Sequence, residues 1–167
     1  MNKNKAIFLD RDGVLNKNCD DYVKSVNELE IFYDVIDSLT KLFHKGYILI
    51  VISNQSAINR GLTNHKNVTE IHEMIQRCFR EKNIYISKFY YCPHRPDEGC
   101  FCRKPKTGLL NEAIREFNIE PKLCWLIGDS DSDVEAGQKI GCSTIKLDSH
   151  TTFELAIEKI LQVNLMI

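Results

Sequence analysis

The chain has 167 residues, of which 43% are hydrophobic and 27% charged, which is typical of a water-soluble globular protein with one domain spanning residues 1–167. Its 22 basic and 23 acidic residues nearly cancel, so we expect neither nucleic acid nor an anionic membrane as a partner. The sequence has no stretch long enough to span a bilayer, and the segment after its basic N-terminus is too short for a signal peptide. We therefore expect a cytoplasmic location, where thiols are reduced. The seven cysteines are accordingly expected to be core residues or metal ligands rather than disulfide partners.

The first predicted element is a buried strand over residues 6–9, which ends in Asp10, Asp12 and Gly13. Open α/β sheets place their ligand crevice at the carboxyl ends of the strands, where these acids would lie. Two carboxylates so close together repel each other, and Mg²⁺ suits such a pair because it prefers carboxylates, water and substrate phosphate. An acidic surface loop is the plain alternative. A calcium-binding EF-hand loop is disfavoured because Val14 stands where an acid is needed.

Further along the chain, hydrophobic periodicity predicts alternating helices and strands. After a polar connection, these are a helix over 35–45, a strand over 47–52, a helix over 64–82, a strand over 84–91, a loop over 92–106, a helix over 109–117, a strand over 123–127, a helix over 134–140, a strand over 143–147 and a helix over 153–161. This alternation predicts an α/β fold with a doubly wound, mostly parallel sheet.

Polar residues follow three of the predicted strands, with Asp10 and Asp12 after the first, Ser53 after the second and Asp129 after the fourth. In a parallel sheet these ends meet in one crevice. Lys104, in the loop before a helix, would add a cation. Acids, a hydroxyl and a lysine together suit phosphoryl transfer.

Each of these residues also has an ordinary structural explanation. Ser53 could simply end its strand, and Lys104 alone would be a solvated surface lysine. Asp131 or Ser132 is expected to be a helix N-cap rather than a ligand. An active site is favoured because all of these residues are predicted to lie together at one edge of the sheet.

A second constellation lies in the predicted loop and combines three cysteines with a histidine over residues 92–102: Cys92, His94, Cys100 and Cys102. Cys₃His is a common ligand set of structural zinc sites. The sequence therefore predicts a zinc-bound loop that aims Arg103 and Lys104 at the crevice. The other four cysteines have no ligand near them in sequence and are expected to be core or surface thiols.

The whole set of motifs resembles the haloacid dehalogenase-like phosphatases. The resemblance is carried by Phe-Leu-Asp-Arg-Asp-Gly at 8–13, Ile-Ser-Asn-Gln at 52–55, Arg-Lys-Pro at 103–105 and Gly-Asp at 128–129. The motif Cys-Pro-His…Cys-x-Cys-Arg-Lys-Pro is similar to that of the branch containing D-glycero-D-manno-heptose 1,7-bisphosphate phosphatases and histidinol-phosphate phosphatases. The loop Asn-Gln-Ser-Ala-Ile-Asn-Arg-Gly at 54–61 resembles the heptose enzymes more closely.

The resemblance implies roles for individual residues. Asp10 would be the nucleophile that forms an aspartyl-phosphate, and Asp12 the acid and base that protonates the leaving sugar oxygen and then activates water. Mg²⁺ would be held by Asp10, Asp129 and the backbone carbonyl of Asp12. Ser53 and Lys104 would stabilise the phosphoryl group. The substrate would be a small sugar phosphate in a monomeric enzyme, bound by Asn54, Gln55, Ser56 and Arg103.

Two features depart from the family pattern. Ser130 follows Asp129, where relatives commonly carry Lys or Arg, and this leaves the exact sugar phosphate open. No separate cap domain is inserted, so we expect an open crevice with the zinc loop as its main wall. The leading hypothesis is hydrolysis of the 7-phosphate of a heptose 1,7-bisphosphate, on the way to nucleotide-activated heptose for surface glycans. Histidinol-phosphate hydrolysis and a non-catalytic phosphosugar-binding module are the alternatives.

Overall fold

The computed structural model describes residues 3–163, and within them the chain forms one five-stranded sheet in which every pairing is parallel. The strands lie in the order β3-β2-β1-β4-β5. Their bounds are β1 (Ala6–Leu9), β2 (Ile48–Asn54), β3 (Lys88–Cys92), β4 (Trp125–Gly128) and β5 (Ser143–Lys146). Successive strands are added first on one side of β1 and then on the other, so the topology reverses beside β1.

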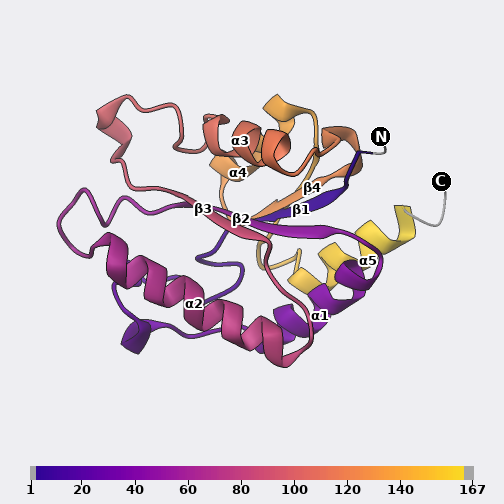
Figure 1. Cartoon of the computed structure of the whole chain (residues 1–167), viewed down its shortest axis with the longest axis horizontal. Coiled ribbons are helices and arrows are strands. Elements are labelled where there is room, and N and C mark those ends of the chain that lie inside the picture. The colour runs from indigo at the N-terminus through magenta and orange to yellow at the C-terminus, as the bar shows by residue number, and fades with distance from the viewer. Residues whose placement is uncertain (1–2, 164–167) are drawn as a thin grey trace.

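Helices cover both faces of the sheet, as Figure 1 shows, with α1, α2 and α5 on one side and α3 and α4 on the other. Their bounds are α1 (Tyr33–His44), α2 (His65–Glu81), α3 (Gly108–Glu116), α4 (Asp131–Ile140) and α5 (Phe153–Val163). This arrangement confirms the predicted doubly wound α/β fold. None of the described helices is long and apolar enough to cross a membrane.

The sheet separates two hydrophobic cores, and β1 contributes to both because successive side chains of a strand point to opposite faces. Ile7 and Leu9 pack with α1, α2 and α5, whereas Ala6 and Phe8 pack with α3 and α4. All four side chains are fully buried. The strand that carries the first acidic motif is therefore anchored rigidly at the centre of the molecule.

Most predicted boundaries lie within a few residues of the observed ones, but the third strand is displaced. The prediction placed it over 84–91, whereas β3 is Lys88–Cys92. Ile84 and Ile86 are buried as predicted, yet the N–H and the carbonyl of Ile86 bond to the side-chain amide of Gln76 on α2. Because a side chain satisfies this backbone, the segment packs on the core without joining the sheet. Cys92, predicted in the loop, is the last residue of β3.

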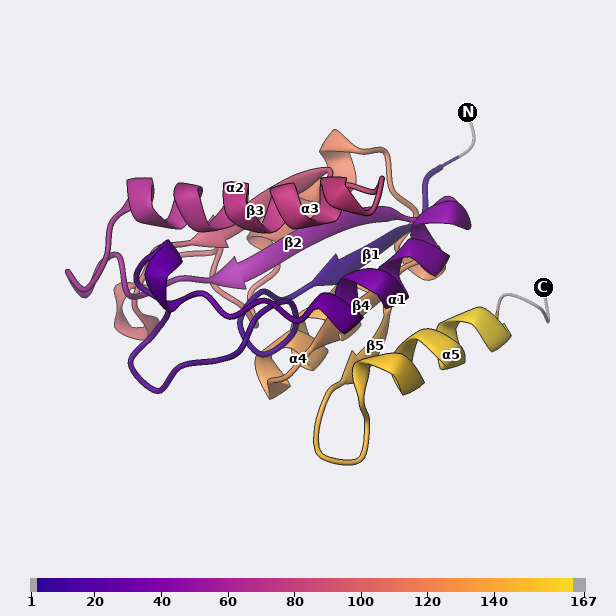
Figure 2. The ribbon, with the colours of Figure 1, turned by 90° about the horizontal axis from the view of Figure 1, so that it is seen from below.

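The connection from β1 to α1 holds a single 3-10 turn at Val26–Glu28 among its described residues, so no cap domain is inserted there. Two other 3-10 turns lie at Pro96–Glu98 and Pro121–Leu123. The second of these replaces the start of the predicted strand over 123–127. In Figure 2 the long β1–α1 connection extends beyond the arrowhead of β2, beside the start of α2.

Candidate active site

Asp10 follows β1 directly, and its backbone N–H still bonds to the carbonyl of Ile127 on β4, at 3.0 Å. This bond fixes the carboxylate at the carboxyl end of the two central strands. Its Oδ1 lies 2.9 Å from the ammonium of Lys104. Burial raises the pKa of Asp10 to about 6, against the opposing charge of Lys104 and with a further contribution from the like charge of Asp133.

Lys104 reaches this position from the loop before α3. It is buried and is therefore not the solvated surface lysine that its sequence context alone would suggest. Its side chain is 2% exposed and pairs with Asp10 and with Asp133 Oδ1, the latter at 2.5 Å. Its ammonium also donates to the carbonyl of Ile52, at 2.6 Å. Burial disfavours the charged form, but the two carboxylates outweigh it and raise the pKa of Lys104. The site thus holds a permanent cation beside Asp10.

Asn54, at the end of β2, holds the backbone of the lysine loop. Its amide nitrogen donates to the carbonyl of Lys104 at 3.1 Å, and its carbonyl oxygen accepts from the N–H of Lys104 at 3.0 Å. In the structure Asn54 is therefore a clamp between two segments 50 residues apart.

Asp12 lies two residues after Asp10 in sequence, but its carboxylate makes a different set of contacts. Arg11, whose side chain is fully buried, donates to it from Nε and Nη2, and Asn16 donates at 2.9 Å. The amide nitrogen of Gln55 donates to Asp12 at 2.8 Å and to Ser53 Oγ at 2.7 Å. Three polar side chains thus fix the orientation of Asp12. Arg11 had no predicted role, because nothing in its spacing indicates that a charged residue between two acids is buried.

Asp129, after β4, completes a group of carboxylates that could hold a cation. One oxygen each of Asp10, Asp129 and Asp133 lie within 4.8 Å of one another. Burial, followed by the charge of Asp133, raises the pKa of Asp129. Gly13 lies against this group with φ +80°, where an added Cβ would stand 2.0 Å from Asp129 Oδ2. Closely spaced oxygen ligands beside a close backbone approach fit Mg²⁺, so the donor set is suitable for that ion.

Asp133 is an acidic residue of the site that was not predicted from the sequence. Its side chain is fully buried at the first turn of α4, between Lys104 and Ser130. The residue that precedes α4 is Ser130, whose N–H and Oγ both donate to Asp133 Oδ2. The expected N-cap at Asp131 or Ser132 is therefore wrong by one or two positions. Ser130 and Asp133 have the spacing of a capping box, and that spacing was a usable signal.

Two predicted substrate residues lie outside the carboxylate group. Arg103 is half-buried and donates to the carbonyl of His94 at 3.3 Å, which places it against the predicted zinc loop. Ser56 is 3% exposed, and its hydroxyl lies 3.3 Å from that of Tyr22. Both residues thus flank the centre of the crevice rather than join it.

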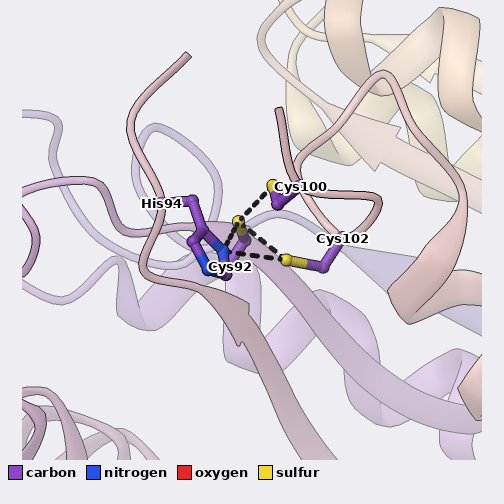
Figure 3. Close-up of side chains that lie close together, drawn as sticks. All are labelled: Cys92, His94, Cys100 and Cys102. Atoms are coloured by element: carbon purple, nitrogen blue, oxygen red, sulfur yellow. Dashed lines mark hydrogen bonds between the residues drawn. The ribbon is translucent and has the colours of Figure 1, made fainter. Parts of the chain in front are cut away.

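The four predicted zinc ligands lie together, with their ligand atoms within 4.8 Å of one another. Figure 3 shows the thiols of Cys92, Cys100 and Cys102 and the ring of His94 turned toward one point. The Sγ–Sγ separations are 3.1 Å between Cys92 and Cys102 and 3.7 Å between Cys92 and Cys100. All seven cysteines are free, and the other four lie apart from this cluster, three of them buried, as expected.

Comparisons with known proteins find relatives of one family. The family model described as HAD-hydrolase-like matches residues 101–160. The D-glycero-β-D-manno-heptose-1,7-bisphosphate 7-phosphatase of Neisseria meningitidis serogroup A is 39% identical over 137 residues, which are 82% of this chain and 73% of that protein. The D-glycero-α-D-manno-heptose-1,7-bisphosphate 7-phosphatase of Photorhabdus laumondii is 35% identical over 98% of this chain and 94% of its own length.

A solved structure shows the same fold. The D,D-heptose 1,7-bisphosphate phosphatase of B. bronchiseptica, complexed with magnesium and phosphate, superposes with a TM-score of 0.87 and 26% identity. The match covers 95% of this chain and 99% of that one. The resemblance stated from the motifs is thus confirmed over nearly the whole length. The chain belongs to the haloacid dehalogenase-like phosphatases, in the branch that includes the D-glycero-D-manno-heptose-1,7-bisphosphate 7-phosphatases.

Proposed function

We propose that the protein is a magnesium-dependent phosphatase that removes the 7-phosphate of D-glycero-D-manno-heptose 1,7-bisphosphate. The observation that carries the proposal is the ion pair between Asp10 and the buried Lys104, 2.9 Å apart at the end of the central strand, in a chain 39% identical to a heptose bisphosphate phosphatase. A carboxylate fixed beside a permanent cation at a strand end is suited to attack a phosphoryl group whose charge the cation offsets.

In this mechanism a carboxylate oxygen of Asp10 attacks phosphorus and forms an aspartyl-phosphate while the bond to the sugar oxygen breaks. Asp12 gives its proton to that oxygen and later accepts one from the water that cleaves the intermediate. The contacts that fix Asp12 support this role because proton transfer requires a defined geometry. Magnesium, bound by Asp10, Asp129 and the backbone carbonyl of Asp12, would supply charge neutralisation.

The phosphoryl oxygens would be held by Lys104 and by Ser53. Ser53 is linked to Asp12 by Gln55, whose amide nitrogen donates to both side chains. Gln55 and Ser56 would line the substrate pocket, with Asn54 acting mainly through Lys104. Arg103 would bind substrate from the zinc-loop side of the crevice.

The test is phosphate release, with Mg²⁺, from the α and β anomers of heptose 1,7-bisphosphate beside histidinol phosphate. Asp10→Asn preserves the shape of the nucleophile and removes its charge, so it should abolish turnover of the preferred heptose. Asp131→Asn is the matched control, because Asp131 is exposed on the first turn of α4 and pairs with Lys146. An Asp10→Asn enzyme with wild-type turnover would contradict the mechanism. A clear preference for histidinol phosphate would contradict the substrate.

We also propose that the Cys₃His cluster binds a structural zinc ion. A tetrahedral site with Zn–S bonds of about 2.3 Å separates its sulfurs by roughly 3.7 Å. The sulfur of Cys92 lies 3.7 Å from that of Cys100, as such a site requires, and 3.1 Å from that of Cys102, which would move outward when zinc binds. The cluster is joined to the active site because the N–H of Gln55 donates to the carbonyl of Cys92, at 2.7 Å. Free cysteines are consistent with a reducing, cytoplasmic compartment.

Metal analysis of the purified protein should give about one zinc per chain. Cys102→Ser should lower both zinc content and melting temperature, whereas Cys19→Ser, outside the cluster, should change neither. Full zinc content in Cys102→Ser, or none in the wild type, would contradict the site. The expected monomeric state stays a prediction that light scattering would check.

A further inference from the structure

The β1–α1 connection forms a second wall of the crevice, in addition to the predicted zinc loop. Its apolar residues, among them Cys19, Val23 and Ile31, pack into the core shared with α1 and α2, whereas Cys100 and Cys102 pack on the opposite core. The two segments therefore lie on opposite faces of the sheet. Figure 1 shows them diverging above and below the sheet beyond the strand ends.

The middle of this connection is tied to the segment that begins α2. The carbonyl of Lys24 accepts from Thr63 Oγ1 at 2.6 Å and from Asn67 Nδ2 at 3.2 Å. The ammonium of Lys24 pairs with Asp21 at 3.1 Å, and Val23 is 1% exposed. These contacts hold the chain firmly on both sides of Tyr22.

Tyr22 itself has φ +62°, in the left-handed region that bulky residues rarely adopt. Glycine or asparagine would fit this backbone without strain, so the shape of the loop does not explain a tyrosine here. Such strain persists only where neighbouring contacts enforce it, and it is concentrated at functional sites. The tyrosine is therefore explained by where its side chain reaches.

The side chain reaches the substrate side of the crevice. Its hydroxyl lies 3.3 Å from Ser56 Oγ, and Ser56 follows Gln55, which donates to Asp12 and to Ser53. Tyr22 is half-buried, and Ser56 is the one side-chain hydrogen-bond partner of its hydroxyl among the described residues. A phenol hydroxyl is both donor and acceptor, so one partner leaves hydrogen-bonding capacity for a ligand.

We propose that Tyr22 is a specificity residue that, together with Ser56, hydrogen-bonds hydroxyl groups of the sugar portion of the substrate. The inference rests on the proposed sugar-phosphate phosphatase function. It adds a residue that would contact the sugar from the wall of the crevice opposite the zinc loop. It makes no contact with the reacting phosphoryl group. Its contribution is therefore to binding of the sugar rather than to the chemical step.

Tyr22→Phe tests the hydroxyl alone, because the ring and the backbone strain are retained. We expect kcat/KM for heptose 1,7-bisphosphate to fall roughly 5- to 10-fold, the loss of one neutral hydrogen bond, mainly through KM. Turnover of p-nitrophenyl phosphate, which has no sugar hydroxyls, should stay unchanged, as should the melting temperature. Tyr85→Phe, at an exposed tyrosine 52% accessible to solvent, is the matched control and should leave both substrates unaffected.

Ser56→Ala should reproduce the loss on the sugar substrate, and the double variant should lose less than the product of the two. Tyr22→Asn, which tolerates the backbone conformation, should lose the sugar preference while its melting temperature stays equal or rises. Equal losses on both substrates, or no loss on either, would overturn the proposal. If the wild type prefers another sugar phosphate, the proposed substrate fails, and the same ratio measured on the preferred sugar still decides the role of Tyr22.

Discussion

A buried histidine should make the stability of this protein fall steeply in mild acid. His72 lies on α2 with 6% of its surface exposed, and its ring stacks on Phe89 with centroids 4.5 Å apart. Its Nε2 is buried without a hydrogen-bond partner. Burial, reinforced by the nearby charge of Arg11, lowers the pKa of His72 from 6.5 to about 3. The folded protein therefore keeps this ring neutral across the range in which an unfolded chain protonates it.

The sign and size of the effect follow from linkage. Below pH 6.5 the imidazole of His72 binds a proton in the unfolded state but not in the folded state. Its contribution to the free energy of unfolding is therefore fully present above that pH and is lost as pH falls toward 3. At 1.36 kcal/mol per pKa unit, the loss is about 2 kcal/mol at pH 5. Asp10, whose pKa is raised to about 6, acts in the opposite direction over an overlapping range. The contribution of His72 is separated from that of Asp10 by comparing the wild type with a variant that lacks only His72.

His72→Phe keeps an aromatic ring against Phe89 and removes the titrating nitrogen. Urea unfolding followed by circular dichroism gives the free energy of unfolding of both proteins from pH 5 to pH 8. The difference should move by about 2 kcal/mol in favour of the variant as pH falls from 8 to 5. Ile75→Val, at a buried position one turn along α2, should lower stability by the same amount at every pH. A pH-independent difference between wild type and His72→Phe would refute the reasoning.

Two further substitutions test the buried charges and the close backbone approach at the site. Lys104→Met leaves two buried carboxylates without their cation, so the free energy of unfolding should fall by about 3–5 kcal/mol; unchanged urea unfolding would contradict the buried ion pairs. Gly13→Ala places a Cβ where Asp129 now lies and keeps φ at +80° only under strain, so the Mg²⁺ concentration for half-maximal phosphate release should rise by at least about 10-fold. An identical Mg²⁺ titration would show that Asp129 does not hold the ion.

The convergence of the acidic residues could be predicted because a parallel sheet leaves little freedom. Once residues 6–9, 47–52 and 123–127 are interpreted as buried parallel strands, Asp10, Ser53 and Asp129 must follow at the same edge. The Cys₃His cluster was equally predictable from the sequence, since its four side chains lie within eleven residues. Lys104 is different: it lies 50 residues beyond Asn54, outside any strand, and its place in the site was predicted from the loop that precedes a helix and the zinc ligands beside it, with support from the family resemblance.

The features that sequence could not supply depend on tertiary contacts. Arg11 and Asp133 are charged residues that are completely buried, although propensity favours the surface for both. Asp133 pairs with Lys104 from another segment, whereas Arg11 pairs with its neighbour Asp12 beneath the packed loops. The left-handed backbone of Tyr22 is imposed by anchors near Thr63 and Asn67, more than 40 positions away. Local patterns gave the strands and their order in the chain, whereas the detailed orientation of the side chains came from packing.

The balance of charge in the crevice has a consequence for the order in which ligands bind. Four carboxylates line it and two buried cations oppose them: Asp10, Asp12, Asp129 and Asp133 against Arg11 and Lys104. Arg103, at the edge of the crevice, lowers the resulting excess of two negative charges to one, which still repels a phosphate dianion, and a divalent cation would more than offset it.

Inorganic phosphate should therefore protect the fold only when Mg²⁺ is present. With Mg²⁺, phosphate at 100 times its dissociation constant would add about 2.7 kcal/mol of stability, which a thermal melt detects as a clear rise in Tm. Without Mg²⁺, the same phosphate concentration should leave Tm where sodium chloride of equal ionic strength leaves it. Equal protection with and without the metal would mean that Lys104 and backbone donors suffice for the anion, and that the carboxylates are protonated or paired more completely than their contacts indicate.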